Sequence, residues 1–390
     1  MKCRFVLTLC VALLGMANGH AEVIYSTIAN PSIIVTGVRS DSAGTDSVVI
    51  TASLNTGGSS TVAALYQGSL ANVTSPTAVW HVLVPVFPGQ TVTSSTFYGP
   101  NTSLFSPSLG AGNVRVVGSY KYAESPSGPN TDHGMIYTGP VDGSGTWTQI
   151  DANALVSGGG LLNTIAHSTM GNLVVGNYDT SLATGNAFIY NIDTGKWLRL
   201  APTIAASHTA YGIWQNGGSS STHYTIAGGL SNVTTGQLDA GYLVNFDSGT
   251  EGIANVRIYN YNNEPATDRI SHFDGITGTA NGFNLTGDQS SLGTGVEGGF
   301  FASVTMGADG SFSDAAWTPI NVAGASVTSG NTVVGNHVLG IYVTGGSSHS
   351  YVATILSAAA VQPVPTLSAW SLIALALLAA GLGTRMRRRG

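Results

Sequence analysis

Residues Asn163–Leu200 read NTIAHSTMGNLVVGNYDTSLATGNAFIYNIDTGKWLRL. Four short apolar runs in this stretch alternate with turns rich in Gly, Asp, Asn and Thr. Short runs of β-branched and aromatic residues between such turns are typical of strands. Variants of the unit recur six times, at a period of about 55 residues that accommodates four strands with their loops. The sequence therefore predicts an all-β fold, a six-bladed β-propeller over residues 22–357.

The repeat is clearest in the second strand of the units, where five of the six carry a β-run that ends on Gly. These glycines are 58, 52, 59 and 58 residues apart, at Gly118, Gly176, Gly228, Gly287 and Gly345. The fourth strand carries a Trp in four units, which we interpret as core packing, at Trp80, Trp147, Trp197 and Trp317. Residues 22–28 precede the first unit and alternate like a strand. We expect them to pair as the outer strand of the last blade and to close the ring.

The charge balance limits the class of partner. Charged residues make up only 8% of the chain, against ~25% in typical soluble proteins. Six of the 13 basic residues lie in the two ends, so seven basic and 19 acidic residues remain between them, a net charge of −12. Such a surface repels phosphate backbones, and nucleic acid is not an expected partner.

The N-terminus reads as a secretory signal peptide over residues 1–21. Lys2 and Arg4 precede an apolar stretch, and a small-residue cleavage site ends at Ala21. Both cysteines, Cys3 and Cys10, lie inside this segment. The mature chain is therefore expected to contain no disulfide and no cysteine metal site.

The middle region resembles extracellular repeat proteins whose units read G-x-V-V-G-x-S followed by an h-A-F-x-W run. Residues 171–178 with 187–190 match this pattern, and so do residues 115–120 with 133–137. The resemblance covers most of residues 32–357. It implies shape and an extracellular location, and it implies no chemistry.

The C-terminus changes in composition after a linker at residues 358–363. An apolar stretch over residues 367–382 is followed by a basic cluster, which predicts a transmembrane helix with a cytoplasmic tail. The segment 364–390 closely resembles the IPTL-CTERM sorting signal, a relative of PEP-CTERM, in which a Pro-Thr-Leu motif and a Trp precede an apolar stretch and an Arg cluster. The matching residues are Val364, Pro365, Thr366, Leu367, Ser368, Trp370, Arg385, Arg387, Arg388 and Arg389.

This resemblance implies a destination for the chain. It implies processing by an exosortase, a membrane-embedded transpeptidase that cleaves near the Pro-Thr-Leu motif, in a Gram-negative host that makes exopolysaccharide. The segment would hold the protein in the membrane before processing. The protein would then be exported through the inner membrane and end at the cell surface or outside the cell.

A search for catalytic motifs yields none, so we assign no catalytic, metal or cofactor residues. No two histidines have H-x-H or H-x-x-x-H spacing, and no loop has the Ca²⁺-binding D-x-[DN]-x-[DN]-G pattern. No Gly-x-Ser-x-Gly elbow or phosphate-binding loop is present. Candidate binding residues are of two kinds. His208 and His272 lie near first strands, and so near the expected central channel, with Asp274 close by. Tyr98, Tyr211 and Trp214 are the aromatic residues expected to be exposed for carbohydrate binding.

Two functions remain open on this basis. The first is a non-enzymatic surface or matrix protein that binds exopolysaccharide or another surface glycan, or is structural. The second is a secreted polysaccharide hydrolase or lyase on a propeller scaffold. The second requires two carboxylates, or a His–carboxylate pair, within about 10 Å at one channel mouth.

Overall fold

A computed structural model describes residues 21–42, 46–58, 60–201, 207–232, 237–264, 269–291 and 297–356. Val23–Ile355 form one compact unit. A second unit comprises Met1–Glu22 with Leu356–Gly390, and nearly all of it lies outside the described residues. The predicted signal peptide, linker, sorting motif and transmembrane helix fall there. Within the described ranges, no helix is long and apolar enough to cross a membrane.

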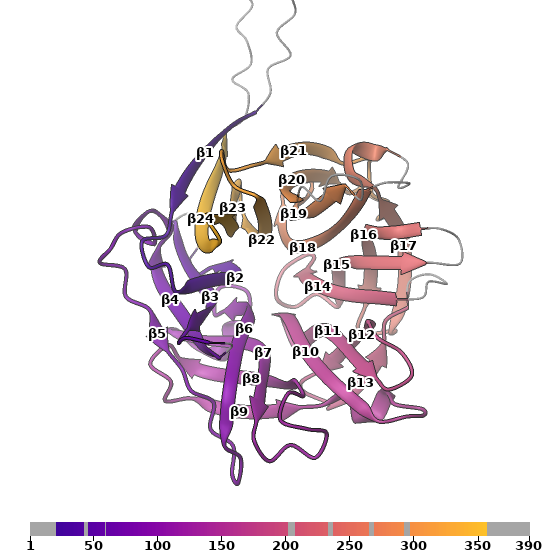
Figure 1. The fold of residues 1–390 in the computed structure, drawn as a ribbon. Coiled ribbons are helices and arrows are strands. Elements are labelled where there is room, and N and C mark those ends of the chain that lie inside the picture. Colours follow the sequence, from indigo (N-terminus) through magenta and orange to yellow (C-terminus); the bar gives the residue numbers. More distant parts are fainter. Residues whose placement is uncertain are drawn as a thin grey trace, which may run out of the picture. The chain divides into compact units, whose positions relative to one another are not determined.

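Six blades surround a common axis, and the first strand of each blade is innermost (Figure 1). Blade 1 comprises β2 (Ile33–Ser40), β3 (Ser47–Asn55), β4 (Thr61–Ser69) and β5 (His81–Val82). Blade 2 comprises β6 (Val92–Thr102), β7 (Asn113–Tyr122), β8 (His133–Pro140) and β9 (Thr146–Ile150). Blade 3 comprises β10 (Leu161–Met170), β11 (Leu173–Thr180), β12 (Asn186–Asn191) and β13 (Lys196–Arg199).

The second half of the ring repeats this arrangement. Blade 4 comprises β14 (Ser207–Gln215), β15 (His223–Asn232), β16 (Gln237–Asp247) and β17 (Gly252–Tyr259). Blade 5 comprises β18 (Arg269–Thr279), β19 (Gly282–Ser291), β20 (Glu297–Thr305) and β21 (Ala316–Ile320). Blade 6 comprises β22 (Val327–Val334), β23 (His337–Thr344) and β24 (Ser347–Leu356). The predicted six-bladed propeller is therefore confirmed.

Neighbouring strands within each blade pair antiparallel. Blades 1–4 are separate four-stranded sheets, whereas blades 5 and 6 are joined by one parallel bridge between Glu297 and Val327. The N-terminal strand β1 (Glu22–Thr27) is next to β24 in the strand order of this joined sheet. Four short 3-10 helices lie in the described connections, at Leu70–Asn72, Pro107–Leu109, Ala152–Leu155 and Tyr261–Asn263.

The core lies between the faces of adjacent blades. Val49 of blade 1 and Phe97 of blade 2 belong to one cluster of buried side chains, and both are fully buried. Val117 of blade 2 and Val174 of blade 3 share the next cluster. Because each blade buries its faces against two neighbours, the ring replaces a single central core.

The four repeated tryptophans pack against aromatic rings of the core. Their ring centroids lie 4.6–6.4 Å from partners in and beside their own blades. The pairs include Trp80 with Tyr66 at 5.5 Å, Trp147 with Phe97 at 5.8 Å, Trp197 with Phe188 at 5.0 Å and Trp317 with Phe273 at 6.0 Å.

The repeated glycine lies inside the second strand rather than at its end. A Cβ added at Gly118 would lie 2.0 Å from the carbonyl oxygen of Thr96 in the inner strand, so no side chain fits there. The equivalent residue in the last unit is Gly340, where the added Cβ would lie 1.8 Å from the carbonyl oxygen of Ser329. Our alignment of the last unit on Gly345 was wrong, because that residue lies in the turn between β23 and β24.

Candidate functional site

Each inner strand contains a β-bulge at the same height. The pairing register with the second strand shifts between Val35 and Gly37 in β2, and at the equivalent place in the other five inner strands. A bulge inserts one residue and changes the direction of its side chain. The six inserted residues, with Asp288 of β19, line one pocket of about 190 Å³: Thr36, Tyr98, His167, Tyr211, Asp274 and Asn331. We call it the axial pocket, because all six blades contribute to it.

One side of the axial pocket is an arc of rings from blades 2–4, which His272 of blade 5 extends beyond the pocket lining. The ring centroids of Tyr98 and His167 lie 5.0 Å apart, those of His167 and Tyr211 4.7 Å, and those of Tyr211 and His272 5.5 Å. We call Tyr98, His167 and Tyr211 the aromatic arc. Such a surface suits an apolar ring face in a ligand.

His167 is held neutral within this arc. Its Nε2 lies 2.5 Å from Oδ1 of Asn177, and burial lowers the pKa of His167 to about 4. At neutral pH the ring therefore carries no charge. The middle of the aromatic arc thus binds through ring faces and hydrogen bonds rather than through charge.

The other side of the axial pocket is acidic. Asp274 and His272 come from β18, with Nε2 of His272 3.3 Å from Oδ1 of Asp274. Asp288 lies directly opposite His272 in the β18–β19 register. Blade 6 holds the Asp288 carboxylate, which accepts hydrogen bonds from the backbone N–H of Gly330 (2.8 Å) and the hydroxyl of Ser329 (2.9 Å). Burial, together with the charge of Asp274, raises the pKa of Asp288 to about 7.

At the other end of the axis a single cation joins five blades. Arg39 is buried at 4% exposure and comes three residues after the bulge in β2. Its guanidinium donates to the carbonyl oxygens of Ile276 (3.1 Å), Ile213 (3.2 Å) and Pro100 (3.4 Å). It also lies 3.4 Å from the hydroxyl of Ser168. Burial lowers the pKa of Arg39 to about 10, so it stays charged at neutral pH.

The structure brings together some of the predicted binding residues and separates others. Tyr98, Tyr211 and Asp274 line the axial pocket, and His272 lies beside it. Trp214 lies at the opposite end of the axis, where its ring is 5.3 Å from the guanidinium of Arg39. His208 is 5% exposed, does not line the axial pocket, and has a pKa lowered by burial.

Four residues of the axial pocket were not identified from the sequence: Thr36, His167, Asp288 and Asn331. The repeated glycine of the second strand was the available signal, because it lies opposite each bulge in five blades. Aligning the inner strands on their bulges would have placed Asn331 and His167 with Asp274. Asp288 required the strand register, because it comes from a second strand.

A Ser–His–Asp chain occurs away from the axis, in blade 2. The hydroxyl of Ser125 lies 2.9 Å from Nε2 of His133, and Nδ1 of His133 lies 2.9 Å from Oδ2 of Asp151. These distances resemble those of a nucleophile and its base. However, Ser125 is only 8% exposed, and its backbone N–H already donates to the carbonyl oxygen of Tyr122. We therefore interpret the chain as a structural link between the β7–β8 loop and the end of β9.

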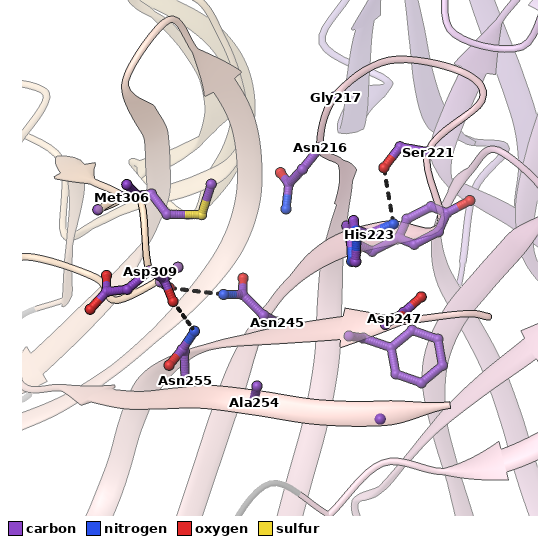
Figure 2. Close-up of a pocket in the computed structure, with 16 residues that line it drawn as sticks. Asn216, Gly217, Ser221, His223, Asn245, Asp247, Ala254, Asn255, Met306 and Asp309 are labelled. Carbon is purple, nitrogen blue, oxygen red and sulfur yellow. Dashed lines mark hydrogen bonds between the residues drawn. The ribbon is translucent and has the colours of Figure 1, made fainter. Parts of the chain in front are cut away.

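A larger pocket of about 520 Å³ lies between blades 4 and 5 (Figure 2). Two of its amide side chains donate to the loop that follows β20. Asn245 donates to the carbonyl oxygen of Gly310 (2.8 Å), and Asn255 donates to that of Asp309 (3.1 Å). These bonds clamp the loop to blade 4, so we assign this pocket a structural role.

Comparison with known protein families identifies the C-terminal segment. Residues 362–389 match the IPTL-CTERM motif, which confirms the resemblance found at residues 364–390. The motif implies export, processing by an exosortase-like enzyme, and a surface or extracellular location. No curated protein matches the chain.

Solved structures with a similar fold are distant in sequence. The Trypanosoma rangeli sialidase in complex with sialic acid is 8% identical with a TM-score of 0.47, over 85% of this chain and 57% of that chain. SapL1 lectin in complex with alpha methyl fucoside is 11% identical with a TM-score of 0.39, over 84% and 97%. The GH43 protein BlXynB from Bacillus licheniformis is 10% identical with a TM-score of 0.37, over 74% and 56%. At these identities and TM-scores, the similarity does not indicate a ligand for this chain.

Proposed function

We propose that this exported propeller is a non-enzymatic component of the cell envelope or extracellular matrix, and that its axial pocket binds one unit of a surface glycan. The observation that carries the proposal is the two-sided lining of that pocket. The aromatic arc lies on one side, and Asp274, Asp288 and Asn331 lie on the other. A sugar ring has the matching character, with an apolar C–H face and hydroxyls at its edge.

The size of the axial pocket supports recognition of a single unit. Its volume of about 190 Å³ is below the ~300–1,000 Å³ of pockets for drug-sized ligands. One sugar ring fits such a space better than two rings across a glycosidic bond. A polymer would therefore present its terminal unit, or a branch, to the axial pocket.

A second candidate function is polysaccharide hydrolysis, favoured by the raised pKa of Asp288. A carboxyl group with a pKa of about 7 beside a second carboxylate is a general-acid arrangement. The spacing is less favourable, because donor atoms of His272, Asp274 and Asp288 lie within 4.8 Å of one another. Glycosidase carboxyl groups are about 5–5.5 Å apart in retaining enzymes and about 6.5–9.5 Å apart in inverting ones. We therefore place binding ahead of hydrolysis.

A glycan panel tests the proposal. The mature wild-type protein is expected to bind at least one surface-type glycan, and Tyr211→Ala to bind it about tenfold more weakly, a loss of about 1.4 kcal/mol. Tyr190→Ala is the matched control, because this half-buried tyrosine packs on Trp197 in the outer part of blade 3. Equal loss in both variants, or no binding by the wild type, contradicts axial recognition. Release of reducing ends from the bound glycan would favour the hydrolase instead.

The domain limits and the sorting reaction are part of the same proposal. We expect a signal peptide at 1–21, the propeller at 22–357, a linker at 358–363, and a sorting segment with a transmembrane helix at 364–390. Cleavage near Pro365-Thr366-Leu367 would then release the propeller to the surface. Intact-mass analysis of the protein from its own host tests this, because a chain that still ends at Gly390 contradicts processing.

We further propose that β1 closes the ring. Just after β1, the backbone N–H of Ile28 donates to the carbonyl oxygen of Ser350 in β24 at 2.8 Å. The hydroxyl of Tyr25 accepts a hydrogen bond from the backbone N–H of Asn321 at 2.9 Å, and its ring lies 5.9 Å from that of Tyr351. These contacts join the first residues of the mature chain to the last blade and to the connection that follows β21.

A further inference from the structure

We propose that His272, Asp274 and Asp288 form a binding site for a divalent first-row transition-metal ion at the acidic side of the axial pocket. Each residue offers one donor atom, and these three atoms lie within 4.8 Å of one another. A tetrahedral metal ion with its ligands at about 2.0–2.2 Å holds each pair of donor atoms about 3.4 Å apart. Side-chain rotations that bring the donors up to about 1.4 Å closer would therefore complete the site.

The three donors are fixed in position by paired strands. Asp274 is the inserted residue of the β18 bulge, and His272 and Asp288 are directly opposed in the β18–β19 register. Outer hydrogen bonds that orient the ligands are a regular feature of metal sites. Ser329 and Gly330 supply them here, because they donate to the two oxygens of the Asp288 carboxylate and leave further lone pairs on each oxygen.

The charge of the axial pocket also favours a cation. Two carboxylates face each other there, and none of the described residues that line the pocket is Lys or Arg. The buried Arg39 donates to carbonyl oxygens of other blades, so its positive charge does not neutralise the two carboxylates. A divalent ion would neutralise both carboxylates at once.

The donor set indicates which ions are preferred. One imidazole with two carboxylates suits Zn²⁺ or Mn²⁺, whereas Ca²⁺ takes six to eight oxygen ligands. Three protein ligands leave coordination positions for water, as in zinc sites with an open position. We therefore expect Zn²⁺ to bind more tightly than Mn²⁺, and Ca²⁺ to bind weakly.

The proposed metal ion and the proposed glycan would both bind at the axial pocket, but metal binding requires no glycan. A metal titration without sugar can fail while the glycan panel succeeds, and the reverse is equally possible. The two proposals are therefore tested separately.

Isothermal titration calorimetry tests the site directly. The mature protein is treated with EDTA, desalted and titrated with ZnCl₂, and then with MnCl₂ and CaCl₂. We expect one Zn²⁺ per chain, and at least a 100-fold loss of Zn²⁺ affinity in both Asp288→Asn and His272→Gln. Asp142→Asn, in the exposed turn between β8 and β9, is the matched carboxylate control and should bind like the wild type.

Two further measurements make the outcome decisive. Thermal melts in EDTA must show that each variant is folded, so that a loss of affinity reports the site. His133→Gln tests whether the His133–Asp151 pair in blade 2 binds the ion instead. No wild-type binding at millimolar Zn²⁺, binding retained in both pocket variants, or binding lost in His133→Gln with the pocket variants unaffected would each overturn the proposal.

Discussion

The two ends of the ring axis are built from the same six strands and have opposite chemistry. At the axial pocket, the inserted residues of the bulges present rings, a hydroxyl, an amide and one carboxyl group to an open space, and Asp288 of β19 adds a second carboxyl group. Three residues further along β2, Arg39 fills the axis and donates to oxygens from blades 2, 3, 4 and 5. A cavity of only about 30 Å³ lies between these levels.

The difference shows how one repeated strand can serve two purposes. At the Arg39 end the guanidinium donates four hydrogen bonds to groups of the fold, so this end stabilises the ring. At the axial pocket, polar groups face a space large enough for a ligand. We therefore assign stability to the Arg39 end and recognition to the axial pocket.

The largest effect is expected from Arg39→Leu. The substitution leaves buried carbonyl oxygens without donors, including those of Ile213 and Ile276. Each unsatisfied buried group costs about 1–3 kcal/mol, so the free energy of unfolding should fall by about 4 kcal/mol in urea denaturation. Arg257→Ala is the control, because its side chain is 36% exposed in an ion pair with Asp314, and should cost under ~1 kcal/mol. Equal costs for the two variants contradict the stabilising role of the Arg39 end.

Deletion of residues 22–28 tests whether β1 stabilises the outside of the ring, as Arg39 stabilises its axis. Ile28 is 2% exposed, and burying such a side chain contributes about 1.5–3 kcal/mol. With the lost contacts of Tyr25, the free energy of unfolding should fall by about 3 kcal/mol, visible as a lower melting temperature. An unchanged melt would show that β1 does not close the ring.

The axial pocket should make stability depend on pH through His167. Burial lowers the folded-state pKa of His167 to about 4, so between pH ~6.5 and ~4 the unfolded chain binds a proton that the folded chain does not. His167 should therefore contribute about 3 kcal/mol less stability at pH 4 than at pH 6.5, a contribution opposite in sign to that of Asp288 with its raised pKa. His167→Gln should remove the His167 contribution, so its unfolding free energy should rise less with increasing pH than that of the wild type. An identical slope in the variant would mean that this histidine is not held neutral.

The smallest effect is expected from Ser125→Ala in blade 2. Loss of the partner of His133 should cost about 1 kcal/mol, because one hydrogen bond is removed. A fluorophosphonate probe should leave the wild-type serine unmodified if the Ser125–His133–Asp151 chain is structural. Labelling of the wild type that disappears in Ser125→Ala would indicate a reactive serine in blade 2 and contradict a purely structural role of the chain.

The sequence predicted the fold from periodic features. Alternating apolar runs, hairpin turns and the repeated glycine are local signals, and six copies reinforce one another. The last unit was misaligned because its β23–β24 turn carries its own glycines, Gly345 and Gly346, five and six residues after Gly340. A local motif cannot distinguish a glycine required by a bulge from one required by a turn.

The axial pocket was predicted only in part, for a different reason. Three first strands could be aligned with one another, because a small or aromatic residue precedes the pocket residue in each. These pocket residues are Tyr98, Tyr211 and Asp274. Asp288 becomes a neighbour of His272 only through the register of β18 with β19, which spans a hairpin and is not fixed by spacing. Trp214 lies three residues after Tyr211 and faces the other end of the axis. The residue type alone does not indicate which end of the axis an aromatic side chain faces.

That pair of residues supplies the most direct test of the division between the two ends. The measurement is the binding isotherm of exopolysaccharide fragments from the host, compared between Tyr211→Leu and Trp214→Leu in chains whose melts show that both are folded. We predict at least a tenfold loss of affinity for Tyr211→Leu, with affinity unchanged and stability lowered for Trp214→Leu. Equal affinity in the two variants, or loss confined to Trp214→Leu, would contradict recognition at the axial pocket.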